Sequence, residues 1–160
     1  MQTARETYRE RLSPSLWAIV SAAVVAPMAT LVFAPINATL ALAAGAVVAI
    51  VVVILMQTAS PSVRVAHGEL LAGRAHIPVT LLGDPAVLTG EEAREARGPG
   101  LPGTAWHLFR GGIDGVVVVP VIDPDDPVSV WVIASRTPDR LAAAIRAEQR
   151  AETPAAPVTV

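Results

Sequence analysis

An uncharged apolar run of 41 residues near the start of this 160-residue chain constrains its fold more than any other feature. From Leu16 to Met56 the sequence has no Asp, Glu, Lys, Arg or His. A helix that crosses a hydrocarbon core needs roughly 20 apolar residues, so this run is long enough to cross a membrane twice. The break is expected at Pro35 and Asn37, because Pro disfavours helix at the preceding residue and Asn caps helix starts.

This reading divides the chain into five segments. We expect a cytoplasmic N-terminal segment over residues 1–15, transmembrane helices over 16–34 and 38–56, a soluble β-rich domain over 61–150 and a disordered tail over 151–160. A buried helix pair of a soluble protein would carry a polar face. A cleaved signal peptide has an apolar region of about 7 to 15 residues. The run fits neither alternative.

The distribution of arginines predicts the orientation in the membrane. Arg5, Arg9 and Arg11 precede the first predicted span, Arg64 and Arg74 follow the second, and no basic residue lies between the spans. Cytoplasmic segments carry the excess of basic residues, so we expect a multi-pass protein of the cell membrane with both termini in the cytoplasm. The span cores hold no charged or amide side chain, which argues against transport by this chain alone.

Small residues recur at every fourth position in both predicted spans. These stripes are Ala22, Ala26 and Thr30 in the first span, and Ala41, Gly45 and Ala49 in the second. Small side chains let helix backbones approach closely in a membrane. We expect the stripes to pack the two helices together, although a partner helix or a second copy could use the same surfaces.

The region after Pro61 predicts a small antiparallel β domain. Residues 62–73 have the alternation and the Gly-containing turn of a β-hairpin, and further strands are expected over 75–82, 106–110, 116–122 and 128–134. The spacing of Thr89 and Glu92 is typical of a capping box before a short helix. Thr137 and Pro138 are typical of the start of a last, amphipathic helix.

The predicted fold class is therefore an α+β membrane protein. An N-terminal two-helix transmembrane hairpin is followed by an antiparallel β domain that a C-terminal helix closes. This plan of strands and one final helix is similar to that of pleckstrin-homology-like domains. The likeness concerns the fold and carries no function.

Three groups of residues carry a more specific resemblance. They are Tyr8-Arg9-Glu10-Arg11-Leu12, then Val63-Arg64-Val65 with Gly68 and Leu70, and finally Asp123-Pro124-Asp125-Asp126-Pro127 with Trp131, Ser135-Arg136 and Pro138. Over nearly the whole chain they resemble a family of two-pass membrane proteins from actinobacteria, domain of unknown function 3093. The chain departs from the family pattern at Val128-Ser129-Val130, where the family tends to have an aromatic residue beside the Trp. The resemblance implies a membrane protein and no established activity.

Residues that could carry chemistry are few and scattered. His67, His76 and His107 do not have the spacing of a compact metal motif. Ser135 has no neighbouring base in the sequence, and Gly111-Gly112 precedes a predicted strand, whereas a phosphate loop precedes a helix. Without Cys there is no thiol nucleophile. We expect no cofactor, no metal and no enzymatic activity.

The densest carboxylate group is formed by Asp123, Asp125 and Asp126. It lacks the Gly and the distal Glu of a calcium loop, so we interpret it as a polar turn. With Trp131 and Arg136 these residues are the candidates for an interaction or structural motif.

The balance of charged residues in the predicted β domain bears on whether it binds nucleic acid or anionic lipid. Residues 61–150 carry nine Arg and eleven Asp or Glu, which does not match the clustered basic face of a nucleic-acid-binding protein. The same balance offers little attraction to anionic lipid unless arginines gather in three dimensions. We therefore exclude nucleic acid.

The leading hypothesis is a non-enzymatic domain, anchored in the lipid bilayer, that binds a protein at the cytoplasmic membrane surface through a sheet edge or the last helix. One alternative is an accessory subunit of a larger membrane complex that acts through its transmembrane hairpin. Another is an enzyme acting on lipid or envelope precursors.

Overall fold

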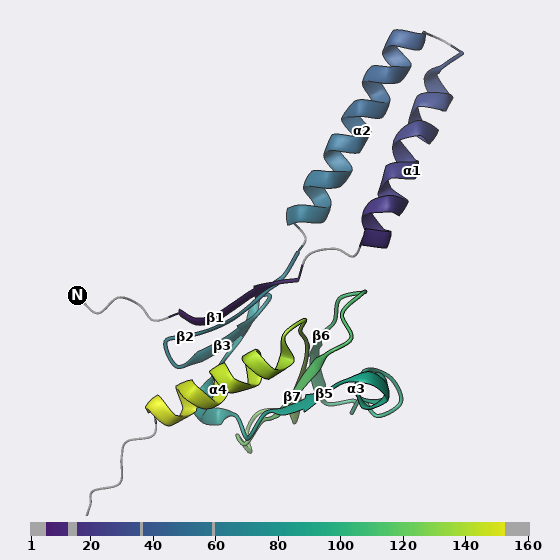
Figure 1. Cartoon of the computed structure of the whole chain (residues 1–160). Coiled ribbons are helices and arrows are strands. Elements are labelled where there is room, and N and C mark those ends of the chain that lie inside the picture. Colours follow the sequence, from purple (N-terminus) through teal and green to yellow (C-terminus); the bar gives the residue numbers. More distant parts are fainter. Residues whose placement is uncertain (1–5, 13–15, 36, 59, 153–160) are drawn as a thin grey trace, which may run out of the picture. The chain divides into compact units, whose positions relative to one another are not determined.

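The computed structural model describes residues 6–12, 16–35, 37–58 and 60–152, and these form two compact units (Figure 1). The β-sheet unit consists of Met1–Leu12 and Pro61–Val160, and the helical unit of Ser13–Ser60. In the sequence, the helical unit is thus inserted into the β-sheet unit, after its first strand.

The first sheet has four antiparallel strands in the order β1-β2-β3-β4. The strands are β1 (Glu6–Arg11), β2 (Ser62–Ala66), β3 (Glu69–Ala72) and β4 (Ala75–Pro78). β1 and β2 are separated by the entire helical unit in the sequence, yet Arg9 lies opposite Arg64 in their ladder. The ladder continues to the amide of Leu12, which donates to the carbonyl of Pro61 at 2.9 Å.

Alternation along β2 decides which face of this sheet is buried. Val63 and Val65 are fully buried, whereas Arg64 between them is half-buried. Successive side chains of a strand point to opposite faces, so one face of the sheet joins the core and the other carries Arg64. Leu70 of β3 continues the buried face.

The turn between β2 and β3 has two residues with positive φ, His67 at 56° and Gly68 at 72°. This is the backbone that a tight two-residue hairpin requires. The amide of Gly68 also donates to the Glu148 carboxylate at 3.3 Å. The hairpin predicted over residues 62–73 is confirmed.

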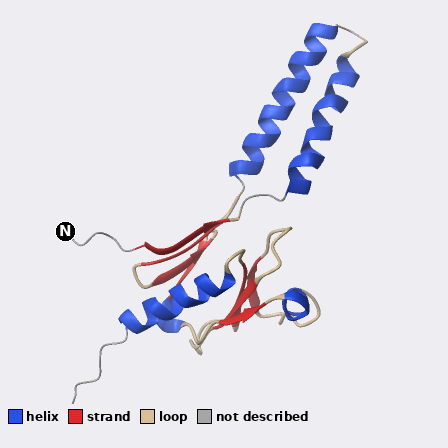
Figure 2. Cartoon of the chain, viewed as in Figure 1, coloured by secondary structure: helices blue, strands red, loops and turns tan. Residues whose placement is uncertain are grey.

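The second sheet has the order β5-β7-β8-β6 (Figure 2). Its strands are β5 (Ala86–Leu88), β6 (Ala105–Leu108), β7 (Val116–Pro120) and β8 (Val130–Ala134). The pairs β5–β7 and β7–β8 are antiparallel, but β6 pairs with β8 in parallel. A parallel pair cannot be joined by a tight hairpin, and here the long connection from β6 to β8 contains β7.

Both sheets share one hydrophobic core with the last helix. The 3-10 turn η1 (Val79–Leu81) and the helix α3 (Gly90–Arg97) precede that helix, α4 (Pro138–Glu152). The core joins Val65 of the first sheet to Ile133 of the second and to Leu141 and Ile145 of α4, all fully buried. The smaller helix α3 contributes the buried Ala93 to a second cluster with Val116 and Val132.

The helical unit contains α1 (Leu16–Phe33) and α2 (Ala38–Thr58). The Asn37 side chain accepts hydrogen bonds from the amides of Thr39 at 2.8 Å and Leu40 at 3.2 Å, so the predicted cap is confirmed. Of the large apolar side chains described as exposed, all except Ile122 belong to this unit. Within the described residues, one helical stretch, Ala38–Met56, is long and apolar enough to span a membrane, and Ala23–Phe33 is a shorter apolar stretch.

The predicted fold class is wrong. The described chain begins with a strand of the β-sheet unit and not with a transmembrane hairpin, and one of its helices, not two, meets the criterion for a membrane span. The β domain comprises two four-stranded sheets, one with a parallel pair, in place of a single antiparallel pleckstrin-like sheet. The fold is α+β, with a helical insertion after the first strand.

The missed strand β1 explains most of this error. Its buried-face residues Tyr8 and Glu10 are polar, and Arg9 and Arg11 alternate with them, so the segment has no apolar period. A strand whose inward side chains are satisfied by hydrogen bonds does not produce the alternation from which strands are predicted. The N-terminal segment assigned to 1–15 therefore contains a strand at Glu6–Arg11, whereas residues 1–5 and 13–15 lie outside the described chain.

Other boundaries of the prediction agree with the structure more closely. A helix starts at Pro138, as Thr137-Pro138 predicts, and it runs to Glu152, so two residues of the tail assigned to 151–160 are helical. The remaining tail residues, 153–160, are not described. A helix also follows Thr89, but the Thr89 side chain makes no capping hydrogen bond.

Substitution of Gly115 tests how closely it packs against the corner between β8 and α4. A Cβ at Gly115 would lie 2.7 Å from the Ser135 carbonyl oxygen and 2.8 Å from Pro138 Cγ. We expect Gly115→Ala to lower the free energy of unfolding by about 1 to 3 kcal/mol, because neither neighbour can move without shifting backbone. Gly111→Ala is the matched control, since a Cβ there meets nothing within 4 Å. Denaturant unfolding of both variants measures the difference, and equal stabilities would contradict the packing described.

Candidate functional site

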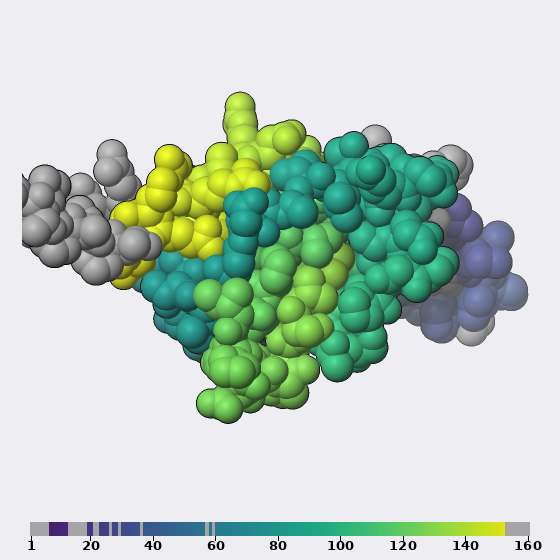
Figure 3. All heavy atoms as spheres, turned by 90° about the horizontal axis from the view of Figure 1, so that it is seen from below, coloured from purple at the N-terminus to yellow at the C-terminus, as the bar shows by residue number. Residues whose placement is uncertain are grey.

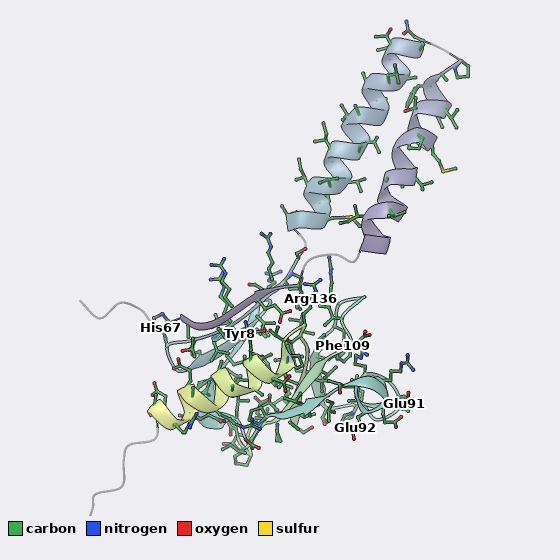
Figure 4. The ribbon with its side chains drawn as sticks, viewed as in Figure 1. Tyr8, His67, Glu91, Glu92, Phe109 and Arg136 are labelled. Atoms are coloured by element: carbon green, nitrogen blue, oxygen red, sulfur yellow. The ribbon has the colours of Figure 1, made fainter. Side chains whose placement is uncertain are left out.

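A cluster of four polar side chains joins β1 to the corner between β8 and α4. Tyr8 and Glu10 come from the inner face of β1, and Ser135 and Thr137 from the corner. Figure 4 shows Tyr8 and Arg136 on the side of β1 that faces α4. The residues are separated by more than 120 positions in the sequence, and β1–β2 pairing brings them together.

The Glu10 carboxylate is the centre of the cluster. One oxygen accepts from the Tyr8 hydroxyl at 2.6 Å and from the Ser135 hydroxyl at 2.5 Å. The other oxygen accepts from the Arg136 amide at 2.9 Å. Both carboxylate oxygens of Glu10 therefore have hydrogen-bond donors from the interface between β1 and the β8–α4 corner.

The hydroxyls around Glu10 are also satisfied. Ser135 is fully buried, and its oxygen accepts from the Thr137 amide at 3.1 Å. The Thr137 hydroxyl lies 2.9 Å from the Tyr8 oxygen and can donate to it, because the Tyr8 proton is directed to Glu10. Since Ser135 is inaccessible and already donates to a carboxylate, it is not placed to act as a nucleophile.

Tyr8 has a perturbed acidity. Burial raises the pKa of its hydroxyl above the ordinary value of 10.0, and the hydrogen bond to Glu10 raises the pKa further. Both effects favour the neutral phenol, since ionisation would place a second negative charge against the carboxylate.

A β-bulge in β1 adds a second attachment to α4. The register between β1 and β2 shifts between Glu6 and Tyr8, and the Thr7 hydroxyl donates to the Glu148 carboxylate of α4. Bulges re-aim side chains relative to the regular alternation. At the other end of the strand, Arg136 Nη1 donates to the Arg11 carbonyl at 3.4 Å.

An open groove of about 670 Å³ follows β1 beside α4. Its lining from β1 is Thr7, Tyr8, Arg9 and Glu10, and its lining from the corner and α4 is Arg136, Thr137, Arg140, Ala143, Ala144 and Ala147. Three alanines form most of the α4 wall, and Arg136 and Arg140 lie beside them. No described strand lies on the outer side of β1, so the groove runs along a sheet edge.

The predicted carboxylate group lies elsewhere. Asp123 accepts from the Asp125 amide at 3.0 Å, and Asp126 accepts from the Val128 amide at 2.8 Å. These are bonds of a polar turn, which connects β7 to β8 and protrudes from the face seen in Figure 3. The turn and Arg136 lie at opposite ends of β8, so the structure does not bring them together.

Trp131 belongs to the core. It is 5 % exposed, and its ring lies 4.1 Å from that of Trp106, its partner in the β6–β8 ladder. Arg136 is the only residue of the predicted interaction motif that reaches the candidate site.

The three histidines are dispersed over different elements. His67 is in the β2–β3 turn, His76 is in β4, and His107 is in β6, where its ring stacks on Phe109 at 4.9 Å. Among the described residues, no three His, Asp or Glu side chains are grouped so that they could hold a metal ion.

The small-residue stripes lie on α1 and α2, as their spacing requires. Ala41 and Gly45 are buried, while Thr30 and Ala49 are half-buried. The side chains of Ala22 and Ala26 are outside the described set. Within the helical unit, helix packing through the stripes remains a prediction.

Sequence reasoning missed Tyr8, Glu10 and Thr137 as site residues. A signal was present, because the residues of the family resemblance include Tyr8, Glu10, Ser135 and Arg136, and the structure gathers these four in one place. Polar residues that recur in a family pattern without an apolar period mark either a site or a buried network.

The fold and the cluster define an α+β protein whose β-sheet unit is interrupted in sequence by a helical insertion and closed by a partly buried Tyr–Glu–Ser network. A family model described as protein of unknown function (DUF3093) matches residues 7–145, and the chain belongs to this family. The match begins within β1 and ends within α4, so it includes both units. No curated protein and no solved structure shows a significant match.

The acidity of Tyr8 provides a direct test of the cluster. Tyr8 is the only tyrosine of the chain, so phenolate absorbance during an alkaline titration reports this residue alone. We expect a midpoint above 10.0. Glu10→Gln should move the midpoint toward the ordinary value, whereas Glu69→Gln should leave it unchanged.

The sign of the linked stability follows from the raised pKa. The folded state binds the Tyr8 proton more tightly than the unfolded state, so this contribution is complete below pH 10.0 and is lost as the pH rises through the folded pKa. Unfolding measured on Tyr8→Phe should lack this alkaline step. A normal midpoint in the parent chain would mean that Tyr8 is not held against Glu10.

Proposed function

We propose that this protein is a membrane-anchored, non-enzymatic interaction protein. Its β-sheet unit binds an extended segment of another protein in the groove between β1 and α4. The single observation that carries the proposal is this groove, because it combines an unpartnered strand edge with an apolar wall and a cationic rim.

Anchoring is supported by the surface of the helical unit. Its exposed side chains include Val20, Leu31, Leu42 and Ile54, each 50 % exposed or more. Soluble monomers rarely expose contiguous apolar patches of this extent. The stretch Ala38–Met56 has 19 residues, about the length that crosses a hydrocarbon core.

The β-sheet unit constrains the route of this anchor. Leu12 and Pro61 are hydrogen-bonded within the unit, so the chain leaves the unit and returns to it at one place. We propose that the whole β-sheet unit lies on the cytoplasmic side of the cell membrane, because arginines flank the apolar run.

The groove has the geometry for strand addition. An edge strand presents a row of backbone amides and carbonyls that can pair with an extended peptide. The facing wall of Ala143, Ala144 and Ala147 is shallow, so a backbone beside β1 would have room for side chains. Catalysis is not supported, because Ser135 is buried and the Glu10 carboxylate is fully engaged.

The charge of the rim indicates the chemistry of the partner. The guanidinium groups of Arg136 and Arg140 belong to residues that line the groove, whereas the Glu10 carboxylate already accepts hydrogen bonds within the polar cluster. Arginine at a groove rim favours acidic side chains and steers their association. We therefore propose an extended partner segment that contains Asp or Glu.

Site-specific photo-crosslinking in the intact membrane tests this proposal. A photo-reactive residue at the exposed Ala143 should capture a defined protein through an acidic segment, whereas the same residue at Glu92 of α3 should not. Arg140→Glu should reduce the product at least about tenfold, because it places a like charge in the groove. Arg94→Glu is the matched control, since Arg94 is an exposed helical arginine away from the groove.

Three results would contradict the proposal. These results are crosslinking at Ala143 to residues 153–160 of the same chain only, no crosslinked product at all, or equal amounts of product in the Arg140→Glu variant and in the parent. A different pair of results would favour the accessory-subunit alternative, in which the helical unit makes the functional contact. In that case, the crosslink at Ala143 would be absent, and exchange of residues 16–58 for an unrelated membrane anchor would abolish function. Turnover of a lipid or envelope precursor by the purified chain would instead support the enzyme alternative.

A further inference from the structure

Three arginines share the face of the first sheet that points away from α4. Arg9 lies opposite Arg64 in the β1–β2 ladder, and Arg11, two residues along, lies opposite Ser62 on the same face. The turn between β3 and β4 lies beside this group, because the Gly73 amide donates to the Ser62 carbonyl at 2.8 Å. We name Arg9, Arg11 and Arg64 the arginine face.

The opposite end of the same sheet is acidic. The β2–β3 turn lies beside Glu148, which accepts from the Gly68 amide. A Cβ at Gly68 would meet the Glu152 side chain, and Glu69 starts β3 at this end. Figure 4 shows the turn residue His67 and Arg136 at opposite ends of β1, with side chains that end in nitrogen rising from the sheet between them. Although the net charge of the sequence is small, basic and acidic side chains therefore lie at different ends of the first sheet.

The arginine face concentrates positive charge on neighbouring strands. Like charges directly opposite on neighbouring strands destabilise a sheet, and Arg9 and Arg64 occupy such a pair. Arg64 is also half-buried, and its Nε is buried without a hydrogen-bond partner. An external array of anions would offset this repulsion and strengthen the folded arrangement.

The place where the chain leaves and re-enters the β-sheet unit indicates what the arginine face binds. The arginine face begins at Arg11, directly before Leu12, and Leu12 and Pro61 are where the chain leaves for the helical unit and returns. We propose that the arginine face docks on the anionic phospholipid headgroups of the membrane that holds the helical unit. The inference rests on the proposed anchoring, and it adds a lipid specificity that the anchoring alone does not provide.

The test uses the full chain with one fluorophore. The sequence has no Cys, so His76→Cys gives a single labelling site on β4, in the same ladder row as Arg64 and Leu71. The labelled chain is reconstituted into nanodiscs of phosphatidylcholine, with and without phosphatidylglycerol, that contain a headgroup-attached quencher. We expect strong quenching only with phosphatidylglycerol, and loss of quenching at high salt, because screening weakens surface electrostatics.

Matched variants separate docking from folding. Arg11→Gln with Arg64→Gln should weaken docking about fivefold for each arginine removed, and neither residue lines the groove. Arg94→Gln with Arg150→Gln removes the same charge from α3 and α4 and should leave quenching unchanged. The salt titration of the parent chain gives an independent answer if the first pair of substitutions impairs folding.

Each outcome decides one of the two proposals. Equal quenching in neutral and anionic nanodiscs, or quenching that resists salt, would overturn the docking of the arginine face while the anchoring stands. Association with anionic but not with neutral nanodiscs would contradict the anchoring and still support the arginine face.

Discussion

The pairing of β1 with β2 is the interaction on which the rest of the structure depends. It joins two strands that the helical insertion separates, and it closes that insertion at the hydrogen bond between Leu12 and Pro61. The loop-closure entropy of so long an insertion must be offset by contacts that β1 makes elsewhere. Leu12 supplies apolar burial, and Tyr8 and Glu10 supply the hydrogen bonds to the β8–α4 corner.

The same strand generates both proposed surfaces. The inner residues of β1 build the polar network and one wall of the groove. Its free edge is the proposed place for an extended partner segment, and its outer residues belong to the arginine face. A change in register by one residue would exchange these faces. Because Glu10 and Arg9 lie on opposite faces of β1, one ladder sets the position of both the proposed partner groove and the proposed lipid-binding face.

Local patterns were sufficient to predict the elements whose side chains alternate or repeat regularly. The β2–β3 hairpin follows from buried valines around Arg64 and a turn at Gly68, and α4 follows from Thr137-Pro138 and the stripe of Leu141 and Ile145. β1 could not be found in this way, because its inward residues are polar and its partner strand lies beyond the helical unit. The candidate site was missed for the same reason, since Tyr8 and Ser135 meet only when that non-local pair forms.

A cross-strand disulfide tests the β1–β2 pairing most directly. Arg11→Cys and Ser62→Cys place two thiols directly opposite each other in the ladder, within the distance a disulfide can bridge. The account predicts nearly complete disulfide formation under mild oxidation in native membranes. It predicts no disulfide between Arg9→Cys and His76→Cys, which are three strands apart, about 14 Å. Failure of the first pair to form, or equal oxidation of both pairs, would contradict the placement of β1 and with it the groove and the arginine face.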